Sequence, residues 1–396
     1  MDFETRYTDE EEREREALRA EVRAWLRDHV AGVGAPVDAA DLSYEQFQRN
    51  RAFLRALGER GWYAPTWPKE FGGGGLAQHV AAVIREEMEA SIPHLDNVHP
   101  PGDIGGSAAG SLWQVGTDEQ KQRFLPPILR GEVITWELYT EPEAGSDLPA
   151  LKTRAERQGD AYVLNGTKTL VGGHFEADYL ETLAITDPNA PRRDNLSAFL
   201  VPSGLPGIVM TDMEMIAGSK KRTIIFEDAR VPADHMIGRE GEGWTAFTTG
   251  LMGALTVGIG PGMDRDERVV AQLLDYCRRE LGGRPEAQDA VARVYVDFQV
   301  QRLFRLRNEW MASTGQRTTY EGSQVSLGRK LFDLKLGEAI HQALGPLALI
   351  SDPAWAPFEG DLEYFHRYAI LMAHPGGTVE IQKLRMFRGM TGGEAG

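Results

Sequence analysis

A Gly-Ser pair in a short polar loop is the part of this chain best suited to chemistry. The loop covers residues 139–147 and reads Tyr-Thr-Glu-Pro-Glu-Ala-Gly-Ser-Asp. Because glycine has no side chain, Gly145 lets the backbone approach a flat ligand closely, and Ser146 adds a hydroxyl beside it. Asn165-Gly166 then separates two strand-like segments and is typical of a two-residue hairpin turn. The sequence therefore predicts a small β unit with a ligand-binding loop on its face.

Metal and disulfide chemistry are not indicated. His94 and His99 flank a short loop, but no cysteine or third ligand accompanies them at a recognisable spacing, so we expect an ordinary loop and no metal site. Cys277 is the single cysteine, which excludes an intrachain disulfide and favours a reducing compartment such as the cytoplasm.

The overall charge bounds the possible partners. The 396 residues include 43 basic and 59 acidic side chains, for a formal charge of -16. Such a surface argues against nucleic acid or an anionic membrane as a partner.

The first residues lack the basic-then-apolar pattern of a secretory signal. Residues 244–263 contain no ionisable group, but five glycines and Pro261 favour a helix buried in a bundle over a membrane span.

Helical periodicity dominates both ends of the chain. An amphipathic helix with a solvated charged face is expected from Thr8 onward, and further helical patterns cover 44–58, 80–90 and 119–129. We therefore predict an all-helical N-terminal domain over 1–135. After Gly241 the helical period returns at about 245–280, 286–313, 322–346 and 361–372, which predicts a C-terminal four-helix bundle over 238–396.

Between the helical regions the period changes to two. Strands are predicted at 153–157, 161–164, 167–171, 180–185, 197–201, 208–211 and 222–226. Short strands at close spacing indicate a small barrel or sandwich over 136–237. The predicted fold class is α+β, with a small β-barrel between two helical domains.

Several motifs in order resemble the acyl-CoA dehydrogenase family over nearly the whole chain. They lie at residues 61–73, 124–131, 140–147, 226–232, 241–244 and 377–382. The resemblance implies a tetramer in which FAD lies between the barrel and the C-terminal bundle and is contacted by a neighbouring subunit. It also implies that a carboxylate removes the α-proton of an acyl-CoA while a hydride leaves the β-carbon for the flavin.

The resemblance also assigns cofactor-binding positions. Tyr139 and Thr140 match the edge of the isoalloxazine ring, and Gly145 and Ser146 match the pyrophosphate and substrate side. Arg278 matches a position that contacts FAD phosphate across the subunit interface, although Leu281 replaces the Phe of that motif. Gln342 and Gly345 match a second cross-subunit motif, in which Pro346 replaces a Gly. Thr378 and Glu380 match positions near adenosine.

Departures from the family pattern concern the catalytic base and the flavin wall. The family places its catalytic Glu at one of two positions, which here are Gly376 and Ala254, and Leu255 replaces the Arg that commonly follows the second. Leu170 and Gly172 stand where a Trp and a hydroxyl residue usually contact the flavin. A register slip of one residue would leave Thr169 close to the ring.

No residue is an evident replacement base. His374 titrates near neutrality, which suits a base, but beside Pro375 it also fits a plain hydrogen-bonding role in a turn. Glu380 suits adenosine or solvent, and Tyr368 suits packing within a helix. The catalytic residue therefore stays unassigned.

Three hypotheses follow from these matches and departures. The leading one is an FAD-dependent acyl-CoA dehydrogenase that desaturates a bulky acyl-CoA or acyl-carrier thioester, such as a steroid side chain or polyketide, and passes electrons to an electron-transfer acceptor. Glycines 250, 253, 258 and 260 would widen its acyl pocket. The second is a non-catalytic subunit that pairs with a homologous active chain in a dimer or tetramer. The third is flavin-dependent monooxygenation, which needs no α-proton base.

Overall fold

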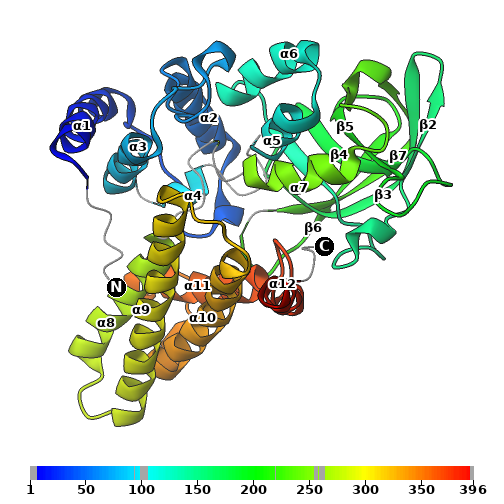
Figure 1. Ribbon diagram of the computed structural model, residues 1–396. Coiled ribbons are helices and arrows are strands. Elements are labelled where there is room, and N and C mark those ends of the chain that lie inside the picture. Colours follow the sequence, from blue (N-terminus) through cyan, green and yellow to red (C-terminus); the bar gives the residue numbers. More distant parts are fainter. Residues whose placement is uncertain are drawn as a thin grey trace. The chain divides into compact units, whose positions relative to one another are not determined.

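The computed structural model describes residues 7–92, 94–98, 106–218, 220–253, 257 and 264–392. The chain forms two compact units (Figure 1). The first unit holds the elements from α1 to α7, including the sheet, and the second holds α8 to α12.

Helices form the N-terminal part of the first unit. They are α1 (Asp9–His29), α2 (Tyr44–Glu59), α3 (Gln78–Ser91), α4 (Leu95–Val98), α5 (Gly106–Val115) and α6 (Asp118–Leu129), with short 3-10 turns at Ala39–Asp41 and Lys69–Phe71. Local sequence explains where two of them begin. Ser43 accepts a hydrogen bond from Gln46 N at the start of α2, and Thr117 forms a capping box with Gln120 at the start of α6. The helices predicted at 44–58, 80–90 and 119–129 are confirmed.

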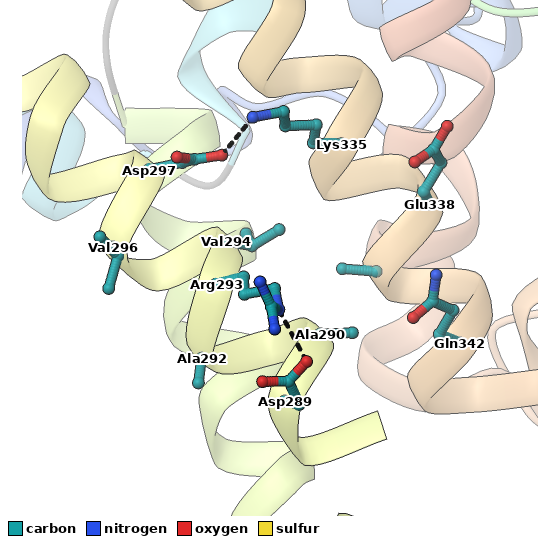
Figure 2. A pocket seen from close by; sticks show the side chains of 11 residues that line it. Asp289, Ala290, Ala292, Arg293, Val294, Val296, Asp297, Lys335, Glu338 and Gln342 are labelled. Atoms are coloured by element: carbon teal, nitrogen blue, oxygen red, sulfur yellow. Dashed lines mark hydrogen bonds and ion pairs between the residues drawn. The ribbon is translucent and has the colours of Figure 1, made fainter. Parts of the chain in front are cut away.

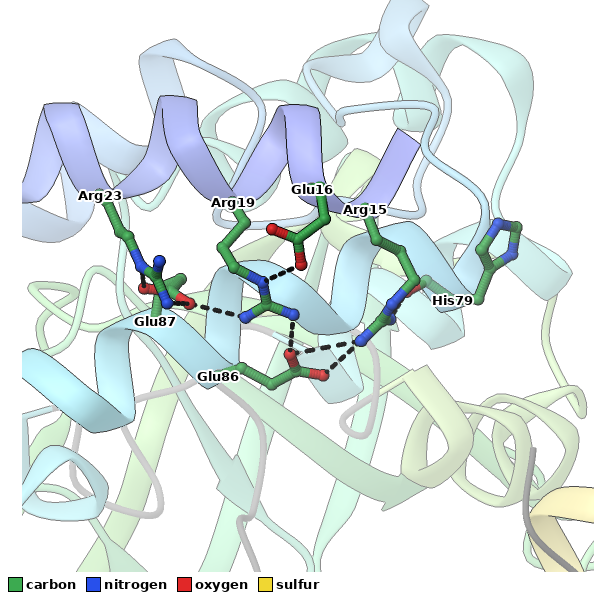
Figure 3. Close-up of polar contacts among 7 residues, drawn as sticks. All are labelled: Arg15, Glu16, Arg19, Arg23, His79, Glu86 and Glu87. Carbon is green, nitrogen blue, oxygen red and sulfur yellow. Dashed lines mark hydrogen bonds and ion pairs between the residues drawn. The ribbon is translucent and has the colours of Figure 1, made fainter. Parts of the chain in front are cut away.

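The sequence predicts that the charged face of α1 is solvated. In the structure this face instead forms ion pairs with α3 (Figure 3). Glu87 is 4% exposed and accepts from Arg19 Nη1 at 2.6 Å and from Arg23 Nε at 2.6 Å. Glu86 accepts from Arg15 Nη2 at 3.0 Å and from Arg19 Nη2 at 2.8 Å. Helical periodicity could not show this because the partner carboxylates lie on a helix that is distant in sequence.

The described residues of the middle region form an eight-stranded sheet. Its strands are β1 (Thr135–Leu138), β2 (Arg154–Gln158), β3 (Ala161–Gly172), β4 (Tyr179–Ile185), β5 (Leu196–Pro202), β6 (Ile208–Met213), β7 (Lys221–Pro232) and β8 (Met236–Ile237). Their order is β6-β7-β3-β2-β4-β5-β8, with β1 parallel to β4. Side chains alternate between two cores. Trp136 and Leu180 enter the core within the sheet, and Tyr139 and Leu183 join the core shared with the helices.

The predicted hairpin turn at Asn165-Gly166 is wrong. The strand β3 passes through both residues, and the β2–β3 hairpin turns instead at Gly159 and Asp160. A register shift opposite β7 marks Asn165-Gly166 as an irregularity within the ladder. Gly166 is needed there because an added Cβ would lie 2.4 Å from Thr153 Oγ1. The same dipeptide therefore serves close packing in place of chain reversal.

The glycine-rich region after the sheet does not form one long bundle helix. The predicted helix at 245–280 is wrong, because α7 (Gly243–Gly253) belongs to the first unit and α8 (Asp264–Glu280) to the second. The helices α5 and α7 pack on each other. An added Cβ on Gly250 would lie 2.5 Å from Ser111 Oγ, so this glycine brings the two helices together and does not widen a pocket. Gly258, Gly260, Ala254 and Leu255 lie outside the described residues.

The second unit is a helical bundle. Its helices are α8, α9 (Pro285–Ser313), α10 (Glu321–Leu344) and α11 (Asp361–Met372), with α12 (Val379–Thr391) against α10. Its core gathers Leu273, Phe298, Phe332, Leu336 and Phe365. The predicted class of fold is confirmed, whereas the boundaries at residues 135 and 237 stay predictions. Among the described helices, none has the length and apolar character needed to cross a bilayer.

We predict that Glu87→Gln lowers the free energy of unfolding by about 2 to 3 kcal/mol, because it leaves Arg19 and Arg23 without their shared, buried carboxylate. Urea unfolding followed by circular dichroism measures the change. Glu16→Gln is the control, since Glu16 pairs with the same Arg19 at 3.0 Å but is 66% exposed along its side chain. Equal losses in the two variants would contradict the importance of burial.

Candidate functional site

The Gly-Ser loop (residues 139–147) is anchored by a buried ion pair. Lys168 Nζ on β3 lies 2.8 Å from Glu141 Oε1, and the two side chains are 0% and 5% exposed. The Glu141 carboxylate also accepts from Lys152 N at 2.6 Å, from Thr153 N at 3.0 Å and from Thr153 Oγ1 at 2.5 Å. One carboxylate therefore ties the loop to β3 and to the segment that leads into β2.

The buried position changes the pKa values of Lys168 and Glu141 by different balances of burial and charge. Burial lowers the pKa of Lys168 to about 8, although the charge of Glu141 opposes the change. Burial would raise the pKa of Glu141, but the Lys168 charge and the hydrogen bonds to the carboxylate lower it below its ordinary value. The difference in hydrogen bonding explains these opposite results. The carboxylate receives hydrogen bonds from four donors, whereas the ammonium donates to Glu141 and to the more distant Tyr139 carbonyl at 3.4 Å.

Beyond the anchor, the loop presents its Gly-Ser pair to solvent. Glu141 N donates to Ala144 O at 3.0 Å, and Ala144 N donates to Glu141 O at 3.1 Å, which closes a tight turn. Gly145 and Ser146 follow this turn and are exposed. The atom nearest to a Cβ added at Gly145 is Thr140 Cγ2, at 3.8 Å. The backbone of this pair is therefore accessible from solvent, and its role in binding a ligand stays a prediction.

The strand β3 lies directly beside the loop. Thr169 N donates to Thr140 O at 2.9 Å. Leu170 follows at φ +56° and is 49% exposed, within a register shift between Lys168 and Val171. A non-glycine residue in the left-handed region is uncommon and marks local strain. An apolar side chain is therefore presented to solvent next to the loop, while Thr169 Oγ1 lies 3.4 Å from Thr223 Oγ1.

Gly172 is the last residue of β3, and the backbone that follows it is held by contacts with other strands. Arg222 donates to Gly173 O at 2.8 Å and to His174 O at 2.7 Å. A Cβ on Gly173 would lie 2.2 Å from the Trp136 ring, so only glycine permits this contact. The backbone beyond Leu170 is therefore held in place from both β7 and β1.

Arg278, Gln342 and Gly345 lie in the second unit. Arg278 is exposed in the last turn of α8. Arg284 donates to Ala343 O at 2.9 Å and to Gln342 O at 3.0 Å, which ties the loop after α8 to the end of α10. Gly345 follows there at φ +59° and caps α10 through its N–H to His341 O. The structure thus places these three predicted residues at one end of the bundle.

A groove between α9 and α10 reaches Gln342 (Figure 2). Its volume is about 620 Å³. Two ion pairs lie along it, Arg293 with Asp289 and Lys335 with Asp297, each at 2.7 Å. The exposed amide of Gln342 therefore faces a surface of mixed charge.

Thr378 and Glu380 belong to the start of α12. Thr378 caps this helix by accepting from Ile381 N at 3.3 Å, and Glu380 is exposed in the first turn. Gly376 is exposed at φ +70°, its carbonyl accepts from Gln382 Nε2 at 2.8 Å, and no heavy atom lies within 4 Å of an added Cβ. The position at which the family places a base is thus an open turn.

The three candidate replacement bases all lie in the second unit. Tyr368 lies within the bundle, where the Arg265 guanidinium is 4.1 Å from its ring centroid and burial raises its pKa. His374 and Glu380 are exposed. In the described part of the chain, no group of three or more His, Cys, Asp or Glu residues could hold a metal.

Two glutamates that sequence reasoning missed lie side by side on the sheet. Glu137 of β1 and Glu181 of β4 are register partners in the parallel ladder. Ser111 Oγ on α5 lies 2.6 Å from Glu181 Oε1, and Ser107 Oγ lies 2.6 Å from the Tyr139 hydroxyl. The available signal was a single charged residue inside each of two otherwise uncharged strands.

Burial makes both glutamates weaker acids than usual, and the charge of Glu181 adds to this effect at Glu137. Burial, followed by the charge of Glu181, raises the pKa of Glu137 to about 7, against the opposing charge of Lys221. Burial likewise raises the pKa of Glu181. Glu181 is 1% exposed, whereas Glu137 keeps partial access to solvent despite its deep position. Near neutral pH the pair therefore carries a proton that either group could hold.

Comparisons with known proteins account for this architecture. The family model "Acyl-CoA dehydrogenase, N-terminal domain" matches residues 12–132, and "Acyl-CoA dehydrogenase, middle domain" matches residues 137–229. Acyl-CoA dehydrogenase IpdE1 of Mycobacterium tuberculosis is 30% identical over 93% of this chain and 95% of its own length. The chain belongs to the acyl-CoA dehydrogenase family. Members of this family are oxidoreductases, so the protein is an enzyme by descent.

Other family members extend the likeness over the full length. Acyl-CoA dehydrogenase FadE26 of M. tuberculosis is 29% identical over 92% of this chain and 94% of its own. The solved structure of the Tcur3481-Tcur3483 steroid ACAD matches with a TM-score of 0.79, 25% identity and all of both chains. The ChsE4-ChsE5 complex from M. tuberculosis matches with a TM-score of 0.77 and 25% identity, over 98% of this chain and 99% of that one.

We predict that Glu137→Gln flattens the pH dependence of stability. The carboxyl titrates at about 7 when folded and at its ordinary value of 4.5 when unfolded. Between these values the folded state binds more protons, so the free energy of unfolding falls as pH rises. The variant should gain about 1 to 3 kcal/mol relative to the wild type between pH 4.5 and 8. Urea titrations at several pH values test this, with exposed Glu156→Gln on β2 as the control. An unchanged slope would contradict it.

Proposed function

We propose that this family member is an FAD-dependent dehydrogenase that introduces an α,β double bond into a bulky acyl thioester. The observation that carries the proposal is the Gly-Ser loop, an exposed backbone surface held in place by the buried Glu141–Lys168 pair. Because the buried ion pair already fixes its backbone, the exposed part of the loop can bind a planar cofactor without first becoming ordered.

The residues around the loop are compatible with a flavin. Tyr139 and Thr140 would meet the isoalloxazine edge. Leu170 would be an aliphatic contact where relatives use an aromatic ring, and Gly172 would stand where they use a hydroxyl residue. Gly145 and Ser146 would approach the pyrophosphate through bare backbone and a hydroxyl. The residues proposed for the phosphate and adenosine portions are Arg278, Gln342, Gly345, Thr378 and Glu380. When bound, FAD supplies the acceptor for a hydride.

The substrate class is proposed from similarity along the whole chain. A matched structure covering all of this chain is described as a steroid ACAD, and its identity of 25% supports a related, bulky acyl group. We propose a CoA or carrier thioester as substrate and an electron-transfer protein as acceptor. In this scheme the chain's own residues bind and orient the thioester beside the loop.

Flavin content and substrate-dependent bleaching test the proposal. Released FAD is counted per chain, and the absorbance near 450 nm is followed without oxygen after adding acyl-CoAs that include steroid side-chain thioesters. We expect about one FAD per chain and loss of the flavin absorbance with a bulky thioester. A flavin-loaded protein that no thioester bleaches would refute desaturation by this chain. A protein that takes up no FAD would refute the cofactor.

We predict that Lys168→Met lowers FAD content by at least about fivefold, because the buried Glu141 carboxylate loses its counter-charge and the loop loses its anchor. Lys152→Met is the matched control. Lys152 forms an ion pair with Glu143 of the same loop, but both side chains are more than 70% exposed. Flavin absorbance per protein after saturation with FAD measures both. Equal losses would show that burial of the pair is not what holds the loop.

A second candidate function is that of one subunit in a mixed dimer or tetramer. The observation that favours it is Gly376, an open turn where relatives place the base. The Tcur3481-Tcur3483 and ChsE4-ChsE5 structures each name two different chains, which supports such a pairing. Purifying this chain alone, with size-exclusion chromatography and the bleaching assay, decides the matter. An active, flavin-loaded homomer would exclude the second function.

A further inference from the structure

A buried lysine holds the turn between α11 and α12 (residues 373–377). Lys330 lies on α10 and is 7% exposed. Its Nζ donates to Met372 O at 3.0 Å and to Pro375 O at 2.6 Å. Met372 is the last residue of α11, so the ammonium lies at a helix C-terminus, where a positive charge is favourable. One side chain therefore fixes both the end of α11 and the path of the turn that follows.

The other side of the turn is held from α12. Gln382 is 3% exposed, and its Nε2 donates to Gly376 O at 2.8 Å. Gly376 and Gly377 adopt φ values of +70° and +93°, which favour glycine. A Cβ added at Gly377 would lie 3.1 Å from Gln382 Nε2, so the backbone passes closely over this amide. The turn therefore has a defined conformation that two buried donors stabilise.

Position explains the buried lysine better than neutralisation of charge. In the part of the chain that the structure describes, the Lys330 ammonium forms no ion pair, and its hydrogen bonds go to carbonyl oxygens. Burial lowers the pKa of Lys330, and the charge of Asp333 only partly opposes this effect. A neutral donor would serve the same carbonyls at a smaller cost of desolvation. The long stem of a lysine instead provides the reach from α10 to the turn.

We propose that Lys330 is a positioning residue for the cofactor and acts through the turn on the first residues of α12. Thr378 directly follows the turn and caps α12 by accepting from Ile381 N at 3.3 Å. Glu380 is exposed in the first turn of the same helix. This role rests on the proposed function, in which Thr378 and Glu380 contact the adenosine portion of FAD.

The effect of Lys330 on the cofactor is indirect. Its partners Met372 and Pro375 precede Thr378 by six and three residues in the chain. A loose turn would have to become ordered when FAD binds, and that loss of conformational entropy would weaken binding. Lys330 therefore contributes to the affinity for FAD, while the absorbance maximum of bound flavin does not depend on it.

Two measurements on the purified full chain test this role. Hydrogen–deuterium exchange of the FAD-free protein reports on the turn itself, and Lys330→Met should speed exchange in residues 373–382 at least about tenfold. Titration with FAD, followed by flavin fluorescence, should show an at least about tenfold higher Kd. Lys335→Met is the matched control on the same helix, because that lysine pairs with Asp297 and is 58% exposed along its side chain. Lys330→Arg keeps a donor and should recover most of the affinity.

A double-mutant cycle distinguishes positioning from a general loss of stability. Glu380→Gln removes one proposed contact with adenosine. In the wild-type background we expect it to raise the Kd for FAD at least about fivefold. In the Lys330→Met background the same change should cost less than about twofold, because α12 is no longer held in register with the cofactor. Equal effects of Glu380→Gln in the two backgrounds would overturn the positioning role.

The outcomes also separate this role from the proposed function. Unchanged exchange in Lys330→Met, or faster exchange with unchanged affinity for FAD, would overturn the role of Lys330 and leave the proposed function intact. Weaker FAD binding as expected, without bleaching by any thioester, would uphold the role and overturn desaturation. Absence of FAD binding by the wild type would overturn both.

Discussion

The buried pair between Glu141 and Lys168 is the interaction on which the candidate site depends. Desolvation makes both ions expensive, and the structure offsets that cost by directing four donors at one carboxylate. These donors come from β3 and from the segment before β2. A single charge therefore fixes the position of the loop relative to two strands. The exposed Gly145 and Ser146 need no partners of their own to be held in place.

The same sheet carries a second buried acidic site with the opposite solution. Burial raises the pKa values of Glu137 and Glu181, and the charge of Lys221 only partly opposes this effect at Glu137. Where a close counter-charge is present, the carboxylate stays ionised; where its effect is only partial, the pair retains a proton. Glu137 lies on β1 and Glu141 follows that strand in the Gly-Ser loop, so the two arrangements are only four residues apart in the chain.

Close approach explains most of the informative glycines. Gly166 permits contact with Thr153, and Gly250 permits contact of α7 with Ser111 of α5. In the second case the contact also positions Ser111 between Glu181 and Ala246. Gly250, which the sequence analysis expects to widen a pocket, thus helps to set the geometry around Glu181. The open space occurs instead at Gly376 and Gly145, whose added Cβ atoms would meet little or nothing.

Sequence by itself determined the class of fold, the family and the Gly-Ser loop, because periodicity, caps and ordered motifs are local properties of the chain. Periodicity located the helices at 44–58 and 119–129, whose boundaries are set by Ser43 and Thr117. Only the tertiary structure decided that Asn165-Gly166 continues a strand and that Glu86 and Glu87 pair with α1. It alone also showed that Glu137 and Glu181 meet. These outcomes depend on contacts between residues far apart in the chain, and burial, which sets the charge of a carboxyl group, is a property of the whole fold.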